Sequence, residues 1–222
     1  MNGQLETIAQ SGLQFFGKMA TSISHEIKNV LAIINENAGL LEDLTLLAEQ
    51  GMAIDPQRLK AMSQALMRQI KRADTIVKDM NRFAHSADVS LQITDLKDLM
   101  GLLLALSNRF AAMRGITLNP KLDPSPVTLR TSPFLLMNLL WLCLDFAMAA
   151  TGEDKIVDLI TQKTDAGIQI RFKRIGGLAE AASRQFPAER EKRLLDLLKA
   201  ELEVRTGDHE IIVRLAEGIK KD

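Results

Sequence analysis

FGKMATSISHEIKNVLAII, residues Phe16 to Ile34, is the stretch around which this sequence is organised. Its apolar residues recur every three or four positions, which is the spacing of one face of an α-helix. The pattern comprises Phe16, Ala20, Ile23, Ile27, Val30 and Ile34, and it continues through Ala38, Leu41, Leu44 and Ala48. It predicts one long helix that ends near Glu49, with residues 1–14 as its frayed beginning.

The polar residues of this stretch are predicted to lie on the opposite face. At about 100° per residue, His25 is placed roughly 200° from both Ile23 and Ile27. The neighbours expected on the same face are Lys18, Thr21, Ser22, Lys28 and Asn29. A histidine on a helix surface most often has no chemical role. This one is nevertheless displayed to water among polar groups, so it is a candidate nucleophile.

A second helix is expected after the turn at Gly51, with Asp55 as its N-cap and Pro56 in its first turn. Its apolar residues also follow helical spacing: Leu59, Met62, Leu66, Ile70, Ala73, Val77, Met80 and Ala84. The two stripes predict an antiparallel helical hairpin. Because two helices alone bury little apolar surface, we expect a homodimer in which two hairpins form a four-helix bundle.

The sequence motif in the first helix indicates a family more specifically than its helical periodicity does. Ser24-His25-Glu26-Ile27-Lys28-Asn29 resembles the phosphoacceptor box of two-component sensor histidine kinases, and Phe16–Ala20 is similar to the approach to that box. The family usually has proline after the asparagine, whereas this chain has Val30, which removes a helix kink. The resemblance identifies residues 1–88 as a dimerisation and histidine-phosphotransfer domain, with the acceptor histidine on the outer surface of the bundle.

Composition excludes several classes of function. The chain has 222 residues, a net charge of zero and a pI near 6.9, so neither nucleic acid nor an anionic membrane is an expected partner. The single cysteine, Cys143, rules out an internal disulfide and favours a cytoplasmic setting. No signal peptide is apparent, and we expect no attached sensor domain. The apolar run from Phe134 to Ala150 predicts a buried helix and not a membrane span.

Residues 89–222 contain both strand-like and helix-like sequence patterns. This mixture predicts an α+β sandwich, with one helical layer on one mixed sheet. Short alternating runs predict strands, and the longer apolar or charged runs predict helices. The expected strands cover residues 89–93, 116–119, 127–129, 155–161, 168–172, 202–204 and 211–213, and the expected helices cover 96–113, 133–151 and 187–200.

This order of elements resembles the ATP-binding domain that follows the phosphoacceptor helices in histidine kinases. The chemistry departs from the family, because Phe146 falls at the metal-binding asparagine and Leu142 at its companion. Lys173 begins the segment Lys173–Gly177, where the family has an aspartate that reads adenine, and Gln185–Arg190 replaces a glycine-rich phosphate loop. An apolar side chain offers Mg²⁺ no oxygen ligand. We therefore expect a degenerate domain that does not bind ATP.

The resemblance assigns roles to three residues. His25 would be the phosphoacceptor, since a partly neutral imidazole is a good phosphoryl carrier near pH 7. Glu26 would hydrogen-bond the other ring nitrogen, and Asn29 would orient a water against a phosphoaspartate. Receiver domains of response regulators are the expected partners, and they supply their own Mg²⁺. No cofactor is expected to bind tightly to this chain. His85 and His209 lack metal-ligand spacing and are interpreted as surface residues.

Three functions remain open at this stage. The first is a histidine phosphotransferase in a phosphorelay, which carries phosphate on His25 to or from a receiver aspartate. The second is a regulatory docking module or phosphatase for a response regulator, acting through Asn29. The third is an ATP-dependent kinase with an unusual site, which the degenerate boxes disfavour. Substitution of His25 separates the first function from the second, because only the relay needs an acceptor histidine.

Overall fold

The computed structural model describes residues 2–124, 127–165, 167–182 and 186–216. By their internal contacts the residues form two compact units. The hairpin unit comprises Ala20–Arg82, and the sandwich unit comprises Met1–Met19 together with Phe83–Asp222. The assignment of residues 1–88 and 89–222 to two functional domains stays a prediction.

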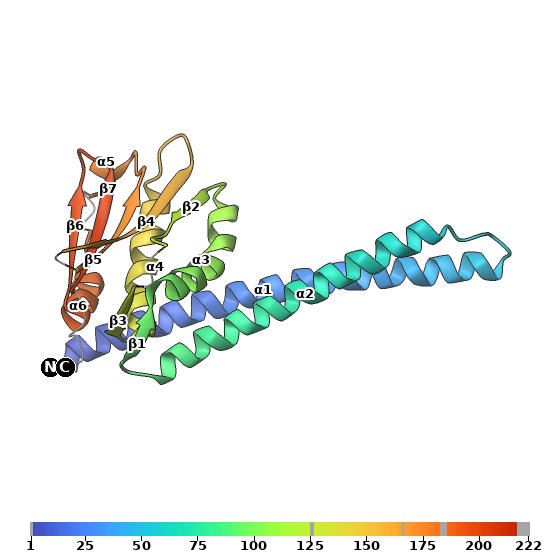
Figure 1. Ribbon diagram of the computed structural model, residues 1–222, viewed down its shortest axis with the longest axis horizontal. Coiled ribbons are helices and arrows are strands. Elements are labelled where there is room, and N and C mark those ends of the chain that lie inside the picture. Colours follow the sequence, from blue (N-terminus) through green and yellow to red (C-terminus); the bar gives the residue numbers. More distant parts are fainter. Residues whose placement is uncertain (1, 125–126, 166, 183–185, 217–222) are drawn as a thin grey trace. The chain divides into compact units, whose positions relative to one another are not determined.

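The hairpin unit consists of parts of two long antiparallel helices, α1 (Asn2–Glu49) and α2 (Pro56–Asp88) (Figure 1). Asp55 precedes α2, and its carboxylate accepts a hydrogen bond of 2.9 Å from the backbone N–H of Gln57, as an N-cap residue does. The side chains of Ile23, Val30 and Leu44 are buried on α1. The helical hairpin predicted from the two stripes is therefore confirmed.

The apolar stripe predicted on α2 faces α1 only in part. Met62 is buried, whereas Ile70 is 53% exposed, Val77 45% and Met80 41%. The buried or half-buried residues of α2 follow a neighbouring line that includes Met62, Ala65, Gln69 and Ile76. Within the single chain, α2 thus carries two adjacent lines of side chains, of which one is covered and the other is exposed.

The sandwich unit contains a five-stranded mixed sheet in the order β2-β4-β5-β7-β6, in which β2 and β4 are parallel and the other neighbours antiparallel. Helices α3, α4 and α6 pack against it. In chain order the elements are β1 (Gln92–Asp95), α3 (Leu96–Met113), β2 (Thr117–Lys121), β3 (Thr128–Thr131), α4 (Pro133–Ala149), β4 (Ile156–Thr164), β5 (Gly167–Lys173), α5 (Leu178–Ala182), α6 (Glu189–Leu198), β6 (Ala200–Arg205) and β7 (Glu210–Leu215).

The predicted α+β class is confirmed, but the prediction that all the strands form one mixed sheet is wrong. Strands β1 and β3 pair only with each other, so they form a separate two-stranded sheet. Helix α5 was not predicted, because five residues are too few to show a helical period. No helix in the described part of the chain is both long and apolar enough to cross a membrane.

The core of the sandwich lies between α4 and the inner face of the sheet. Strand β5 alternates between buried Ile168, Ile170 and Phe172 and more exposed polar residues, as expected of a sheet with one covered face. Helix α4 is buried over most of its surface, including Trp141 at 1% exposure. The prediction that residues 134–150 form a buried helix is confirmed.

The outer face of the sheet is held by ion pairs around Glu210, which is only 1% exposed. Its carboxylate accepts two hydrogen bonds from Arg171 Nη2, at 2.7 and 3.0 Å, and a third from Nε at 3.0 Å. Lys173 and Arg205 lie 3.6 Å from it. A buried carboxylate needs such partners because water no longer solvates it.

The first part of α1 belongs to the sandwich unit and packs on it through aromatic rings. Phe15 meets Phe83 edge-on with 5.3 Å between ring centroids, and Phe134 of α4 lies 5.5 Å from Phe15. Ser11 and Gly12 are buried as well. The prediction of a frayed start over residues 1–14 is therefore wrong at Ser11 and Gly12, because the partner of this segment is distant in sequence.

Candidate functional site

His25 lies in the middle of α1, in the hairpin unit, and its side chain is exposed. Ile23 and Val30, which flank it in sequence, are 6% and 0% exposed. This contrast confirms that the apolar stripe and the histidine lie on different faces. A partner protein can reach the imidazole without any opening of the hairpin.

Glu26 is turned toward α2, although it follows His25 directly in sequence. Its Oε2 lies 3.7 Å from Nη2 of Arg72, and the Glu26 side chain is 23% exposed against 52% for Arg72. Within the described chain Glu26 has this cation as its partner and forms no hydrogen bond with His25. Arg72 lies on the other helix, so sequence spacing alone could not reveal this pairing across the hairpin.

Asn29 is exposed one turn after His25. Residues four apart on a helix are neighbours on its surface. The amide of Asn29 and the imidazole of His25 are therefore presented side by side to an approaching partner, as the helical spacing predicted.

The seam between α1 and α2 is unusually polar beside His25. Ser22 is 4% exposed, so its predicted place on the outer face is wrong. Neither Ser22 Oγ nor Gln69 Oε1 has a hydrogen-bond partner among the described residues. An unsatisfied buried polar group costs free energy, so each of these two atoms lowers the stability that the hairpin would otherwise have.

In the sandwich unit, the positions that resemble a nucleotide site are used for packing. Phe146, at the position of the metal-binding asparagine, stacks on Phe186 with ring centroids 4.0 Å apart and an interplanar angle of 11°. Leu142, at the companion position, is 7% exposed. Neither side chain carries an oxygen, so neither can bind Mg²⁺. No cluster of three or more His, Cys, Asp or Glu side chains suited to a metal is found in the part of the chain that the structure describes.

The segment from Lys173 to Gly177 has structural partners of its own. Lys173 pairs with Glu210, and Arg174, at a φ of 70°, donates to Asp154 Oδ2 from Nε at 2.9 Å. These hydrogen bonds from Arg174 hold the pKa of the Asp154 carboxyl below its usual range. The lysine thus belongs to the ion-pair group of the sheet and offers no acceptor to an adenine amino group.

The two glycines of this segment permit close backbone packing. The backbone N–H of Gly177 donates to the Ala150 carbonyl at 2.8 Å. A Cβ on Gly176 would lie 2.9 Å from the Cα of Gly152, closer than real contacts allow. The glycines are therefore explained by contact with the chain that follows α4. At Phe146, Leu142 and Lys173, the side chains present do not fit the ligands that the family resemblance would place there.

Comparison with known proteins gives similarity to solved structures alone. No family model matches the chain, and no curated protein matches it by sequence. It is similar to the Acinetobacter baumannii histidine kinase AdeS, at 10% identity and a TM-score of 0.47, over 88% of this chain and 98% of that one. It is also similar to a histidine kinase from Burkholderia phymatum STM815, at 17% identity and a TM-score of 0.46, over 86% and 99% of the two chains.

A third similar structure is histidine kinase ThkA in complex with response regulator protein TrrA, at 16% identity and a TM-score of 0.42 over 92% of this chain and 63% of that one. All three of these structures are described as histidine kinases.

The packing of Gly176 is testable by substitution. Gly176→Ala is expected to lower the free energy of unfolding by about 1–3 kcal/mol, because the added Cβ overlaps backbone that cannot move freely. Gly101 is the matched control, since it is exposed in α3 and a Cβ added there would meet no atom within 4 Å. Gly101→Ala is expected to raise stability by about 0.5–1 kcal/mol. Urea denaturation measures both, and a neutral Gly176→Ala would contradict the close packing.

Proposed function

We propose that this chain is a histidine phosphotransferase of a two-component phosphorelay, which carries a phosphoryl group on His25 to or from a receiver-domain aspartate and has no ATP-dependent kinase activity. The observation that carries the proposal is the contrast between its two halves. His25 is exposed within a box that resembles a phosphoacceptor site, whereas Phe146, Leu142 and Lys173 occupy the positions of a nucleotide site.

The chemistry needs little from the carrier beyond an accessible nitrogen. A neutral imidazole nitrogen of His25 attacks the phosphorus of a receiver's acyl phosphate, the N–P bond forms, and the O–P bond to the aspartate breaks as the carboxylate leaves. The reverse reaction delivers the group to a second receiver. Mg²⁺ held by the receiver's own carboxylates would neutralise the charge on the phosphoryl oxygens.

Glu26 and Arg72 are assigned a positioning role in this proposal. The 3.7 Å contact with Arg72 holds the Glu26 carboxylate against α2 and beside the turn that carries His25. A receiver that docks on this face would meet Arg72, half-exposed, close to the transfer site. Competition for Arg72 would release Glu26 to accept the N–H of the non-attacking ring nitrogen of His25.

A second candidate function is dephosphorylation of a docked receiver, or its sequestration, without a phosphohistidine. The exposure of Asn29 one turn from His25 favours it, because the amide can orient a water toward a phosphoaspartate on the same surface. The two functions differ in their dependence on His25. Both place the activity on the same helix face and use a receiver domain as partner.

The proposed active form is a homodimer in which two hairpins make a four-helix bundle. Support comes from the exposed line on α2, where Ile70, Val77 and Met80 are each more than 40% exposed and lie beside the covered line. Contiguous exposed apolar surface of this kind usually marks an interface. We place the protein in the cytoplasm, because its lone thiol, Cys143, is fully buried and outside any disulfide.

The relay is tested by phosphoryl transfer from a panel of phosphorylated receiver domains to the purified chain. We expect rapid label on the chain from one or two receivers, and loss of that label in His25→Ala. Asn29→Ala should retain transfer, because the amide is not the acceptor. His85→Ala is the matched control, since His85 is an exposed histidine at the end of α2.

Label that survives His25→Ala would contradict the proposal. The parent chain could instead release inorganic phosphate from a receiver. If Asn29→Ala abolishes this release and His25→Ala does not, the chain is a receiver phosphatase and not a relay protein.

Dimerisation is tested by sedimentation of the purified chain. We expect a dimer, and we expect the pair Ile70→Glu and Val77→Glu to give a monomer, because each dimer would bury charges without partners. Gln64→Glu is the control, since Gln64 is an exposed α2 residue outside the apolar line and gains one negative charge, as each of the two substitutions does. A monomeric parent chain, or a double variant that remains dimeric, would contradict this interface.

A further inference from the structure

Basic side chains gather on one stretch of α2, within the hairpin unit (Figure 1). This basic cluster consists of Arg68, Lys71 and Arg72, all of which are exposed. Residues three and four positions apart are neighbours on a helix surface, so the three side chains lie side by side. Their like charges repel one another, and this repulsion costs helix stability unless an anion lies among them.

The hairpin supplies little negative charge to the basic cluster. Arg72 lies 3.7 Å from Glu26, which is too far for a hydrogen bond. Arg68 and Lys71 have no ion-pair partner among the residues that the structure describes. Asp74, one turn from Lys71, pairs at 2.7 Å with the next lysine of α2. The charges of Arg68 and Lys71 are therefore presented to whatever approaches this surface.

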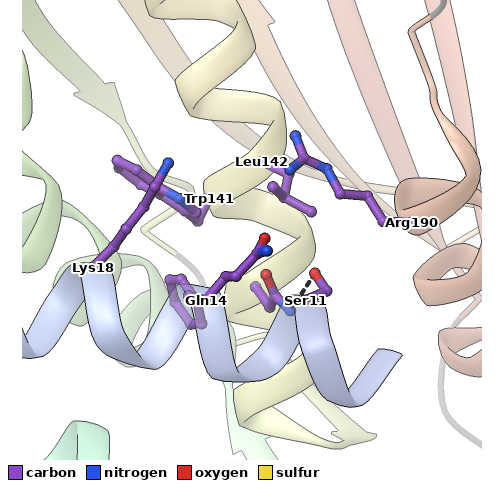
Figure 2. A pocket seen from close by; sticks show the side chains of 8 residues that line it. Ser11, Gln14, Lys18, Trp141, Leu142 and Arg190 are labelled. Atoms are coloured by element: carbon purple, nitrogen blue, oxygen red, sulfur yellow. Dashed lines mark hydrogen bonds between the residues drawn. The ribbon is translucent and has the colours of Figure 1, made fainter. Parts of the chain in front are cut away.

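Two cations of the sandwich unit provide a contrast, because their charges are used within the fold. Lys18 lies over the ring of Trp141, 5.9 Å from its centre, and 3.8 Å from a carboxylate oxygen of Asp145 (Figure 2). Arg190 donates to Glu191 at 2.7 Å. The basic cluster lacks carboxylates at such distances apart from Glu26, so packing within the hairpin does not account for it.

The sign of the charge changes along the hairpin. Residues 36–55, which include its tip, contain no lysine or arginine. They carry the carboxylates Glu36, Glu42, Asp43, Glu49 and Asp55. The contact between Arg72 and Glu26 places the basic cluster beside the turn of α1 that carries His25. An acidic partner is therefore attracted toward His25 and repelled from the tip before any contact forms.

We propose that the basic cluster docks carboxylates on the surface of the receiver domain that exchanges phosphate with His25. The proposal rests on the relay function above and adds the chemistry of the partner, whose contact surface is acidic. Charge complementarity favours this occupant, because Arg68 and Lys71 have no anion of their own and lie near the transfer site. A receiver also brings carboxylates to that site as ligands of its Mg²⁺.

Binding to the unmodified chain gives the first test. Unphosphorylated receivers of the panel are titrated into the full chain in a calorimeter, at about 50 mM and about 200 mM salt. For the receiver that transfers phosphate, we expect the dissociation constant to rise about fivefold or more between the two salt concentrations, because salt screens exposed charge pairs.

Substitutions then locate the docking surface. The pair Arg68→Gln and Lys71→Gln is expected to raise the dissociation constant about tenfold, or about threefold for each change, and to remove most of its salt dependence. The pair also relieves like-charge repulsion within α2, so we expect no loss of thermal stability. The matched control is the pair Arg58→Gln and Lys60→Gln, two exposed cations near the tip, which should bind as the parent does.

Transfer kinetics separate docking from chemistry. In the Arg68→Gln and Lys71→Gln pair, the receiver concentration that gives half the maximal transfer rate should rise about tenfold. The rate at saturating receiver should stay within about twofold of the parent, because neither side chain touches the transferring group. Arg72 is left unchanged in this test, since it also contacts Glu26.

Several results would overturn the docking surface. They are the absence of binding by every receiver, a dissociation constant that does not respond to salt, and equal losses in the two paired variants. A lower saturating rate with an unchanged dissociation constant would overturn it as well. Label on His25 would leave the relay standing in each case, whereas the absence of that label would contradict the relay and leave the calorimetric result as the measure of docking.

Discussion

The seam between α1 and α2 determines which side chains of the hairpin can meet a partner. In a hairpin of two helices, each helix can bury one line of its apolar side chains against the other. Here Ile23, Val30 and Met62 are among the buried residues. Many of the residues outside that line are exposed. On α1 this places His25 and Asn29 at the surface, and on α2 it leaves Ile70 and Val77 exposed. The same packing geometry therefore yields both the candidate chemical face and the candidate dimer face.

In the sandwich unit, the positions that the sequence resemblance assigns to a nucleotide site are occupied by residues with packing or ion-pair partners. Phe146 and Phe186 stack where the family resemblance would place a metal ligand and a phosphate loop. Lys173 joins the ion pairs of Glu210, and Gly176 lies against the backbone of Gly152. Each of these positions now contributes to packing or charge balance. Such contributions would favour retention of the fold if, as we propose, the domain does not bind nucleotide.

Features that depend on local spacing were predictable from the sequence, and features that depend on distant partners were not. The hairpin, the cap at Asp55 and the exposure of His25 follow from helical period. The Glu26–Arg72 contact, the burial of Ser22 and the docking of Phe15 on Phe134 require the register of segments far apart in the chain. The separate pairing of β1 with β3 belongs to the same class, because short strands carry little information about their partners.

In the proposed relay, His25 is an intact phosphoacceptor beside a domain that cannot charge it from ATP. Incubation of the purified chain with labelled ATP and Mg²⁺, combined with calorimetric titration of the same nucleotide, tests this proposal. We expect no label on His25 and no saturable, Mg²⁺-dependent heat of binding at millimolar ATP. Saturable binding that requires Mg²⁺, accompanied by label that His25→Ala removes, would contradict the claim and identify an active kinase.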